Sequence, residues 1–348
     1  MNSQKRFNRV LPEATYIDLV CEDKLSELLH LNAWIRASDK IVLVEKPGEG
    51  NMNFVARVKT NSTSIIVKQS RPWVEKYPQI PAPAERIEVE AKFYEAVSGE
   101  DFFQKYCPRI IGYDKKNFLL ALEDLGEGTD CTFLYQKNSE LEYTELTKVT
   151  SFISHLHNSP IGNAEPFPQN TELKKLNHTH IFYYPFQENN GFNLDTIQSG
   201  LQTVAIPYKT NDVLKERLKQ LGEVYLGKGN CLIHGDYYPG SWLKTKSGIK
   251  IIDPEFSHFG RPEFDIGVMM AHLKMAQIST GTLKKIFEYY QKPNGFDDSL
   301  FFSFCGAEIM RRIIGVAQLP LDLTLTEKSL LLQQASELIL HPSKHGIF

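Results

Sequence analysis

The side chains with the clearest potential for chemistry are two aspartates on either side of a short β-rich segment. Asp236 lies in the run IHGDYYPGS, and Asp253 lies in the run IIDPEF. Residues 242–245 and 249–252 have the polarity of strands, with a polar turn at 246–248, so the segment predicts a β-hairpin. An antiparallel hairpin brings the chain back to within roughly 5 Å of its start. We therefore expect Asp236 and Asp253 to line one cleft.

Carboxylates on neighbouring loops are suited to hold a magnesium ion and to accept a proton. Phosphoryl transfer needs both, because metal ions neutralise the charge of the γ-phosphate while a carboxylate orients the attacking hydroxyl. We assign Asp236 as the base or orienting group, Asp253 as a magnesium ligand and Glu255 as a second source of carboxylate oxygen. The structural alternative is that Asp236 caps a turn and Asp253 ends a strand. That alternative is common for a single aspartate, whereas the pair around a hairpin favours catalysis.

One lysine stands in an otherwise apolar strand. Lys68 lies in the run IIVKQ, and a lysine on a buried strand face needs an anionic partner because an unpaired buried charge is costly. Glu90, on a helix predicted over residues 84–97, can be that partner while Lys68 reaches the α- and β-phosphates of a nucleotide. Glu88 is the competitor, but it lies about 200° away around the helix. The alternative is a surface lysine on an edge strand.

Two further segments can complete a nucleotide site through their backbones. Residues 48–53 (GEGNMN) join the first two predicted strands and can lie over phosphates, with Asn51 and Asn53 as candidate contacts. Gly and Asn equally make an ordinary turn. Residues 119–125 (LLALEDL) end a strand, and the backbone around Glu123 and Leu125 can pair with an adenine edge. The alternative there is a plain linker.

The elements expected to position these residues change in type along the chain. Strands are predicted over residues 41–45, 53–59, 64–69, 109–113 and 118–122, with helices over 22–35 and 84–97. Further helices are predicted over 140–157, 212–226, 264–278, 282–291, 300–318 and 327–340. This change predicts a nucleotide-binding lobe over residues 1–125 and a catalytic, acceptor-binding lobe over 126–348. A polar stretch of weak periodicity at about 166–210 is expected to be an insertion or lid.

Composition and charge exclude several classes of protein. The 348 residues are 42% hydrophobic and 23% charged, as in ordinary globular proteins. A net charge of −3 without a dense Lys/Arg tract argues against a nucleic acid partner. The apolar stretches are too short to cross a membrane, and the first ten residues carry no signal-peptide core. Five scattered cysteines without a Cys-x-x-Cys pair argue against disulfides and zinc, and favour the cytoplasm.

Taken together, these features resemble the aminoglycoside phosphotransferase and choline kinase superfamily. The shared pattern consists of a strand lysine, a helix glutamate, a Glu-Asp-Leu hinge, a His-Gly-Asp loop and a metal-binding aspartate. Here it is formed by Lys68, Glu90, residues 123–125, residues 234–236 and Asp253. The resemblance implies an α+β fold like that of protein kinases, with a small lobe of antiparallel sheet and one helix and a larger, mainly helical lobe. It also implies ATP and Mg²⁺ as cofactors and a small-molecule acceptor.

Within this superfamily the chain is most similar to the methylthioribose kinase family. The matching runs are GNMN at 50–53, VKQ at 67–69, GS at 240–241, DPEF at 253–256, EFDIG at 263–267, where that family has Gly-Phe-Asp-x-Gly, and RRIIG at 311–315. The likeness implies transfer to the anomeric hydroxyl of a 5-methylthioribose-like sugar. It implies that Asp236 is the base and that Asp253 and Glu255 bind metal. It is also consistent with a homodimer.

Four residues are implied on the metal and acceptor side by this likeness. Methylthioribose kinases hold the sugar with an arginine pair, here Arg311 and Arg312, which lie about 100° apart on a helix, so one of them is expected to face the cleft. Ser241 stands where the wider superfamily has a metal-binding Asn, and we expect it to bind metal through water with Glu255 compensating. Tyr238 stands close to the acceptor hydroxyl where methylthioribose kinases have His, so the acceptor can differ from methylthioribose.

Alternative functions differ in the features that favour them. A catalytically silent, kinase-like nucleotide-binding regulator is favoured only by Ser241, and a kinase for another small hydroxylated substrate is favoured by Tyr238. A metal hydrolase would use His258 and His272, but their spacing matches no common zinc pattern. Polycationic aminoglycosides would be repelled by an arginine in the cleft, so a neutral or anionic acceptor is favoured.

Two residues near the catalytic loop are expected to have structural roles. His234 can be taken for a base, but in such a loop it more often holds the turn through hydrogen bonds. Asp265 is at the start of a predicted helix, where a carboxylate is favoured. The superfamily resemblance implies that Asp265 braces the catalytic loop.

Overall fold

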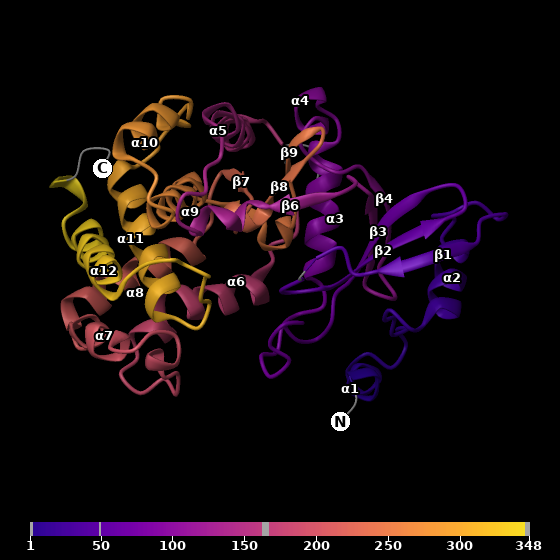
Figure 1. Ribbon diagram of the computed structural model, residues 1–348, viewed down its shortest axis with the longest axis horizontal. Helices are drawn as coiled ribbons and strands as arrows, with labels where there is room; N and C mark the ends of the chain where they lie inside the picture. The colour runs from indigo at the N-terminus through magenta and orange to yellow at the C-terminus, as the bar shows by residue number, and fades with distance from the viewer. Residues whose placement is uncertain (1–2, 49, 162–166, 345–348) are drawn as a thin grey trace. The chain divides into compact units, whose positions relative to one another are not determined.

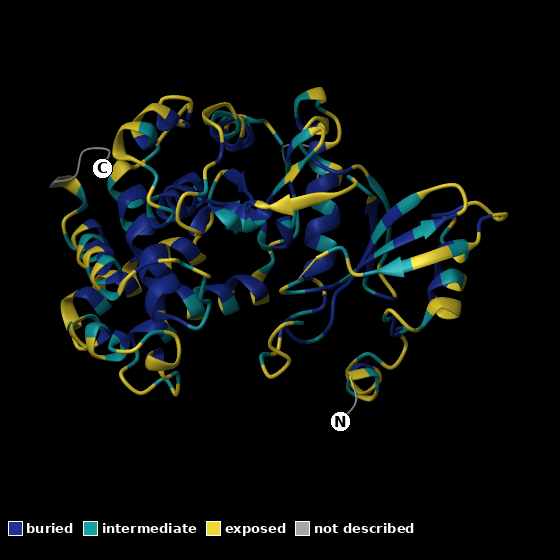
Figure 2. Ribbon diagram, viewed as in Figure 1, coloured by how far each residue is buried: buried dark blue, intermediate teal, exposed yellow. Residues whose placement is uncertain are grey.

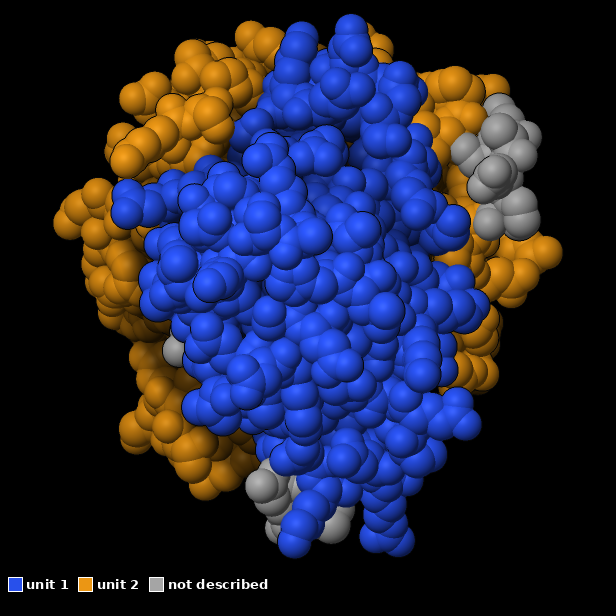
Figure 3. Space-filling view, turned by 90° about the vertical axis from the view of Figure 1, so that its right-hand side faces the viewer, with its two compact units in different colours: residues 1–128, 250–256 blue, residues 129–249, 257–348 orange. Residues whose placement is uncertain are grey.

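The computed structural model describes residues 3–48, 50–161 and 167–344. Glu49 of the predicted glycine-containing loop and Pro166, where the predicted insertion begins, lie outside these residues. The chain forms two compact units, which Figure 3 shows in different colours. Unit 1 comprises Met1–Gly128 and Lys250–Phe256, and unit 2 comprises Thr129–Ile249 and Ser257–Phe348. Unit 1 therefore includes a short segment from far along the chain.

Unit 1 is built on a five-stranded antiparallel sheet in the order β1-β2-β3-β5-β4 (Figure 1). The strands are β1 (Ile41–Glu45), β2 (Phe54–Thr60), β3 (Ser64–Gln69), β4 (Ile110–Asp114) and β5 (Leu119–Glu123). Each lies within one residue of its predicted bounds. Successive side chains point to opposite faces, and one face buries Ala56, Val67 and Ala121 against the leucines of α2 (Glu22–Leu31).

The other face of the sheet positions Lys68. In the strand register Lys68 is paired with Val55 of β2 and Leu120 of β5. Its neighbour Val67 belongs to the core on the α2 side, so Lys68 points to the opposite face, which α3 (Arg86–Val97) covers. The predicted lysine-bearing strand and its helix are both present.

The N-terminal helices differ from the prediction in two places. Helix α2 ends at Leu31, not at Ile35, because Ala33 has a φ of 54°, a left-handed conformation that a helix cannot contain. Helix α1 (Ser3–Val10) was not predicted, because its single buried residue, Phe7, gives no helical periodicity. Phe7 packs in a small cluster with Tyr16 and Trp73. The proline-rich residues 71–83 form an irregular loop, as predicted.

Unit 2 is mainly helical. Its longer helices are α5 (Tyr143–Asn158), α8 (Asp212–Leu226), α9 (Pro262–Met275), α10 (Thr280–Phe287), α11 (Asp298–Ile314) and α12 (Leu325–Leu340). Helix α11 packs against both α9 and α12, and the burial colours of Figure 2 show α9 and α11 as the buried centre of this unit. The predicted helices are all present, with ends shifted by up to four residues.

The stretch at about 166–210, which shows weak periodicity in the sequence, contains helices among its described residues, and its role as an insertion or lid stays a prediction. This stretch contains α6 (Thr171–His178) and α7 (Leu201–Lys209), and its apolar residues Leu173, Ile181 and Leu201 are buried. A π-helical turn over Thr179–Tyr183 follows α6 directly. Because a π turn inserts an extra residue, it shifts the phase of the apolar positions. The segment therefore lacks the 3.6-residue period that would have predicted a helix.

Short strands surround the predicted catalytic loop. In unit 2, β7 (Cys231–Ile233) pairs antiparallel with β10 (His258–Gly260). Strands β8 (Trp242–Thr245) and β9 (Gly248–Ile251) occupy the two arms of the predicted hairpin. Two further short elements are α4 (Asp101–Gln104) and β6 (Gly128–Asp130). In the part of the chain that the structure describes, no helix combines the length and apolar character needed to cross a membrane.

Candidate active site

The amine of Lys68 contacts two carboxylates in unit 1. Its Nζ lies 2.5 Å from Glu90 Oε1 and forms a second ion pair with Asp253. Glu88, the competing partner, instead pairs with Lys115. Burial disfavours the charged amine, but the carboxylates of Asp253 and Glu90 outweigh this effect and raise the pKa of Lys68. Lys68 is therefore a fixed cation, as an interaction with nucleotide phosphates requires.

Asp253 is the more accessible of the two carboxylates predicted to bind metal. Its side chain is 46% exposed, and its backbone has a φ of 62°, an uncommon conformation that is frequent at functional sites. Mg²⁺ is usually held by one or two carboxylates together with substrate phosphates, and Asp253 fits this mode. Within residues 3–48, 50–161 and 167–344, no group of three or more His, Cys, Asp or Glu side chains is arranged to hold a metal ion.

Glu255 is buried and already has two partners in unit 1. Its Oε2 accepts a hydrogen bond from Asn53 Nδ2 (3.1 Å) and lies 3.0 Å from Arg86 Nε. Burial raises the pKa of Glu255, and the guanidinium of Arg86 opposes this rise. A metal ion bound to this oxygen would displace at least one of these contacts. The geometry thus favours Asp253 over Glu255 as the residue that would hold Mg²⁺.

Arg86 is central to this arrangement, and the sequence analysis missed it. It lies on α3 one turn before Glu90, so both side chains are on one face of the helix. Besides Glu255, its guanidinium contacts four backbone oxygens, those of Met52, Arg71, Trp73 and Pro83. Arg86 therefore ties the end of the 48–53 loop to the segment that follows Asp253. Its spacing of four residues from Glu90 was the available signal.

The two asparagines of the 48–53 loop differ in their surroundings. Asn51 is exposed, and its backbone oxygen accepts a hydrogen bond from the amide of Lys76 (2.9 Å). Asn53 is buried, and its side chain lies between Glu255 and Ser70, donating to the first and accepting from the second. Asn51 is thus the residue of the two that is open to a ligand, while Asn53 holds the loop in place.

The segment after β5 is fixed mainly by Asp124. Arg57 of β2 donates two hydrogen bonds to its carboxylate, from Nε (2.9 Å) and Nη2 (3.1 Å). Glu123 accepts a hydrogen bond from the amide of Arg109 (3.1 Å), and Leu125 is half-buried. The side chains of Asp124 and Glu123 therefore have structural contacts. A contact with adenine at this segment remains a prediction that concerns the backbone.

The loop that carries Asp236 is held from two sides in unit 2. Asp265, in the first turn of α9, accepts hydrogen bonds from the amides of His234 (2.6 Å) and Gly235 (2.9 Å). Gly235 has a φ of 82°, which glycine adopts without steric cost. Tyr237 is fully buried and donates a hydrogen bond to a backbone oxygen of α5. Asp265 therefore braces the loop, as expected.

The carboxylate of Asp236 is paired with Arg312. Arg312 Nη2 donates to Asp236 Oδ1 (3.3 Å), and the backbone oxygen of Asp236 accepts a hydrogen bond from Ser241 Oγ (2.8 Å). Burial raises the pKa of Asp236, while the charges of Arg312 and Arg311 oppose this rise. A carboxylate with a raised pKa is a stronger proton acceptor than an ordinary one. Ser241, a predicted metal ligand, thus has a structural contact with the predicted base.

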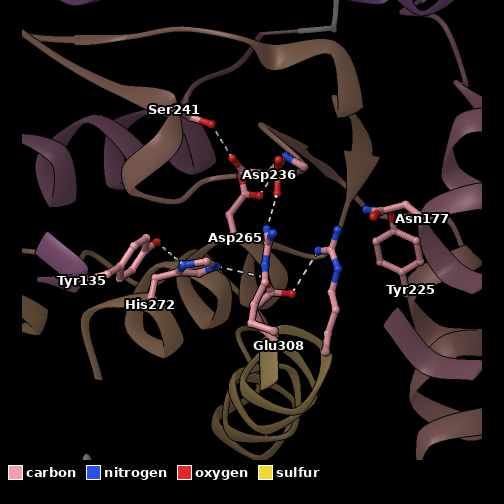
Figure 4. A network of polar contacts seen from close by, with 11 residues as sticks. Tyr135, Asn177, Tyr225, Asp236, Ser241, Asp265, His272 and Glu308 are labelled. Atoms are coloured by element: carbon pink, nitrogen blue, oxygen red, sulfur yellow. Dashed lines mark hydrogen bonds and ion pairs between the residues drawn. The ribbon is translucent and has the colours of Figure 1, made fainter. Parts of the chain in front are cut away.

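Both arginines of α11 contact Glu308, which the sequence analysis also missed. Arg311 Nη1 lies 3.1 Å from Oε2, and Arg312 Nε lies 2.6 Å from Oε1. Figure 4 shows Glu308 within the polar network that includes Asp236. The guanidinium carbon of Arg312 is 4.8 Å from the centre of the Tyr238 ring. Of the pair, it is therefore Arg312 that reaches Asp236 and Tyr238.

Comparison with known proteins decides the family. Residues 48–298 match the model of the phosphotransferase enzyme family. The chain belongs to this family. The match covers most of the chain and includes Lys68, Asp236 and Asp253, and it confirms the predicted class of reaction, a small-molecule kinase.

Curated relatives of this phosphotransferase are methylthioribose kinases. The enzyme of Exiguobacterium sibiricum is 24% identical over 319 residues, which cover 79% of this chain and 80% of the relative. The enzyme of Bacillus cereus strain B4264 is 26% identical over 321 residues, which cover 79% of each chain. The predicted likeness to this group is therefore confirmed, at an identity that leaves the acceptor open.

Solved structures confirm the protein-kinase-like α+β fold of this phosphotransferase. A choline kinase from Cryptosporidium parvum aligns over 94% of this chain and 99% of its own, with a TM-score of 0.58 and 15% identity. A spectinomycin phosphotransferase, solved in complex with ADP and spectinomycin, aligns over 94% of this chain and 100% of its own, with a TM-score of 0.52 and 12% identity. These likenesses concern the fold.

The roles assigned to single residues stay predictions for this phosphotransferase. The structure brings Lys68, Glu90 and Asp253 together in unit 1. It brings Asp236 together with Arg312 in unit 2. The predicted cleft shared by Asp236 and Asp253, and the division into lobes at residue 125, likewise stay predictions.

Proposed function

We propose that this chain transfers the γ-phosphoryl group of ATP to a hydroxyl of a small uncharged polyol, most simply a 5-methylthioribose-like sugar. The observation that carries the proposal is the pairing of a half-buried aspartate, Asp236, with Arg312 beside Tyr238. This pairing supplies a proton acceptor in a site whose charge is balanced. The methylthioribose kinases among the relatives support a sugar acceptor.

In the proposed transfer step one P–O bond forms and another breaks. The oxygen of the acceptor hydroxyl attacks the γ-phosphorus, and a new P–O bond forms. The bond between the γ-phosphorus and the oxygen that bridges it to the β-phosphorus breaks, and ADP leaves with the electron pair. The proton of the hydroxyl passes to the carboxylate of Asp236. A base contributes typically 10²–10⁴-fold to such a step, and a raised pKa suits it for that role.

The nucleotide half of the proposal rests on unit 1. Lys68, held by Glu90, would contact the α- and β-phosphates, and Asn51 with the backbone of the hinge residues Glu123 and Leu125 would lie along the nucleotide. Asp253 would hold Mg²⁺, which when bound neutralises charge on the β- and γ-phosphates. Arg86 holds the 48–53 loop in position through its contacts to Met52 and Glu255.

The acceptor half rests on the charges around Asp236. Asp236 and Glu308 carry two negative charges, and Arg311 and Arg312 carry two positive charges within one network. A polycation gains little from such a balanced site, whereas a neutral polyol can use its hydrogen-bonding groups. The proposal therefore favours an uncharged acceptor over aminoglycosides or choline.

Replacement of Asp236 by Asn tests this function. We expect Asp236→Asn to lower kcat for the best acceptor by about 10²–10⁴-fold, because the amide cannot accept the hydroxyl proton. The KM for ATP and the melting temperature should change little. The measurement is ADP release with a panel of 5-methylthioribose, other pentoses, choline, homoserine and an aminoglycoside.

The matched control is Asp212→Asn, at an exposed position in the first turn of α8. This control should keep full activity. Undiminished turnover by Asp236→Asn would contradict the assignment of the base. A wild-type preference for choline or the aminoglycoside over every neutral polyol would contradict the proposed acceptor class.

We also propose that this protein is located in the cytoplasm and forms a homodimer. All five cysteines are free thiols, and four of them are buried, which suits a reducing compartment. Light scattering during gel filtration measures the oligomeric state directly.

A further inference from the structure

Glu308 is the point at which the acceptor-side network of unit 2 converges. It lies on α11, three residues before Arg311 and four before Arg312, so all three side chains share one face of the helix. Its side chain is 1% exposed. It accepts hydrogen bonds from Arg311 Nη1 (3.1 Å) and Arg312 Nε (2.6 Å), and its Oε1 lies 2.9 Å from His272 Nε2. Both carboxylate oxygens are therefore occupied by donors.

These contacts make the two arginines different from each other. Arg312 uses Nε for Glu308 and Nη2 for Asp236, and its guanidinium lies over Tyr238. Arg311 contacts Glu308 through Nη1, and within the described residues its buried Nε has no hydrogen-bond partner. Arg312 is thus committed to the predicted base, whereas Arg311 keeps donors for another group.

The histidine behind Glu308 adds no charge to the network. Burial lowers the pKa of His272 to about 4, and the charges of Arg311 and Arg312 hold the pKa of Glu308 well below its ordinary value despite its burial. An ionised Glu308 only accepts hydrogen bonds, so His272 donates from Nε2. Its Nδ1 then accepts from the hydroxyl of Tyr135 at 2.6 Å. Figure 4 shows Tyr135, His272 and Glu308 following one another in this order.

The formal charges of the five side chains in this network consequently sum to zero. Asp236 and Glu308 are negative, and Arg311 and Arg312 are positive, while His272 is neutral. In a buried site the interaction between unit charges is far stronger than in water. Removal of one negative charge should therefore strengthen the attraction for an anionic acceptor. Removal of one positive charge should strengthen the attraction for a cationic acceptor.

We propose that Glu308 is a positioning residue that determines the charge of the acceptor this enzyme prefers. It directs Arg312 to the predicted base, leaves Arg311 for the acceptor, and keeps the pocket neutral. This inference rests on the proposed function, since it concerns the acceptor side of the same site. It goes beyond that function because it names a residue, outside the reacting groups, that sets selectivity.

Two substitutions that change the charge of the network in opposite directions test the inference. Glu308→Gln leaves two guanidiniums against one carboxylate, a net charge of +1. Arg311→Gln leaves two carboxylates against one guanidinium, a net charge of −1. The acceptors are three sugars of one skeleton that differ in a single group, which is a methylthio group, a carboxylate or an ammonium. The measured quantities are kcat/KM for each acceptor and KM for ATP.

We expect Glu308→Gln to raise the ratio of kcat/KM for the carboxylate sugar to that for the methylthio sugar by about tenfold or more. We expect Arg311→Gln to raise the corresponding ratio for the ammonium sugar by a similar factor. KM for ATP should change by no more than about twofold in both. Glu308→Asp keeps the charge and should therefore keep the wild-type preference, although kcat falls because the shorter side chain misplaces Arg312.

A matched control is Glu337→Gln at an exposed position of α12, which changes the net charge equally and should leave all three ratios unchanged. Calorimetric binding of the same acceptors without nucleotide gives the sign of the preference even when the wild type transfers no phosphate to them. A failure of the proposed acceptor class is thereby distinguished from a failure of the role proposed for Glu308, because the binding preference is measured without phosphate transfer. The inference would be overturned if Glu308→Gln and Arg311→Gln moved the preference for charged acceptors in the same direction. It would also be overturned if neither the kcat/KM ratios nor the calorimetric preference changed. If Glu308→Gln does not fold, Arg311→Gln and Glu308→Asp still decide it.

Discussion

Three buried basic side chains, Lys68, Arg86 and Arg312, each hold a carboxylate that the proposed reaction places near its substrates. A buried ion pair contributes little net stability, because desolvation offsets the attraction between the charges. Its more secure effect is to fix a carboxylate in one position. In this chain Asp253, Glu255 and Asp236 are fixed in this way.

Arg86 offers a direct test at the scale of one residue. Replacement by Met leaves Glu255 and four backbone oxygens without their donor, so we expect Arg86→Met to lower the free energy of unfolding by about 3–5 kcal/mol. The KM for ATP should rise as well, because the 48–53 loop loses its connection through Met52. Urea denaturation and ADP release measure the two effects.

The comparison for this variant is Arg217→Met, at an exposed position of α8, which should change stability by no more than about 0.5 kcal/mol. In an otherwise Glu255→Gln background the cost of Arg86→Met should be smaller, because the buried negative charge is already gone. Equal costs in the two backgrounds would show that the Arg86–Glu255 pair is not the cause.

The residues that the sequence predicted and those that it missed differ in a physical way. Lys68 was noticeable because a lone charge in an apolar strand conflicts with its neighbours. Arg86 and Glu308 lie on helices, where charged residues are usually solvated, so nothing in the local pattern indicated that they are buried. Only the packing of distant segments around them, such as residues 71–83 around Arg86, brings their partners within reach.

At the scale of elements, the strands of unit 1 were predictable because each is a short run rich in apolar residues that is bounded by a turn. The helices of unit 2 were predictable in type but less so in their ends. Nearly every residue of helices α9 and α11 is buried. These helices therefore lack the amphipathic pattern from which the first and last residues of a helix can be estimated. The stretch around α6 was missed because the π turn at Thr179–Tyr183 disturbs the helical period.

The contact between α11 and α12 gives a prediction at this scale. A Cβ added to Gly306 would lie 2.5 Å from the backbone oxygen of Ala335, so the two helices would have to move apart. We expect Gly306→Ala to destabilise the protein by about 1–3 kcal/mol. Because α11 carries Glu308 and both arginines, acceptor KM should rise more than ATP KM.

The contrasting substitution is Gly281→Ala in α10. The nearest atom to its added Cβ is Ser279 Oγ at 3.9 Å, so we expect about 0.4–1 kcal/mol of stabilisation from the reduced freedom of the unfolded chain. Thermal unfolding of both variants checks the pair. A Gly306→Ala protein as stable as the wild type would mean that the α11–α12 contact adapts easily.

At the scale of the whole molecule, stability should depend on pH through His272. Its pKa is lowered to about 4 in the folded protein from an ordinary value of 6.5. Between these values the unfolded chain binds a proton that the folded chain does not, so the free energy of unfolding falls as the pH decreases. We expect a loss on the order of 3 kcal/mol between pH 7 and pH 4 from this residue.

The measurement is urea unfolding at several pH values for the wild type, His272→Gln and His341→Gln. The His272→Gln protein should be less stable at pH 7 and should show a shallower decline below pH 6.5. His341 is exposed, and its replacement should keep the wild-type slope. A His272→Gln slope equal to that of the wild type would place the pH sensitivity elsewhere.

Because unit 1 is made of two separate stretches of the chain, it cannot be completed until late in synthesis. The partner of Arg86 and one partner of Lys68 lie in Lys250–Phe256, and residues 129–249 must be synthesised first. At about 5–20 residues per second this takes roughly 6 to 24 s. During that interval Lys68 lacks Asp253 and Arg86 lacks Glu255, because these acidic residues have not yet been synthesised. Chaperone association of stalled nascent chains should therefore decline once residue 256 has emerged from the exit tunnel.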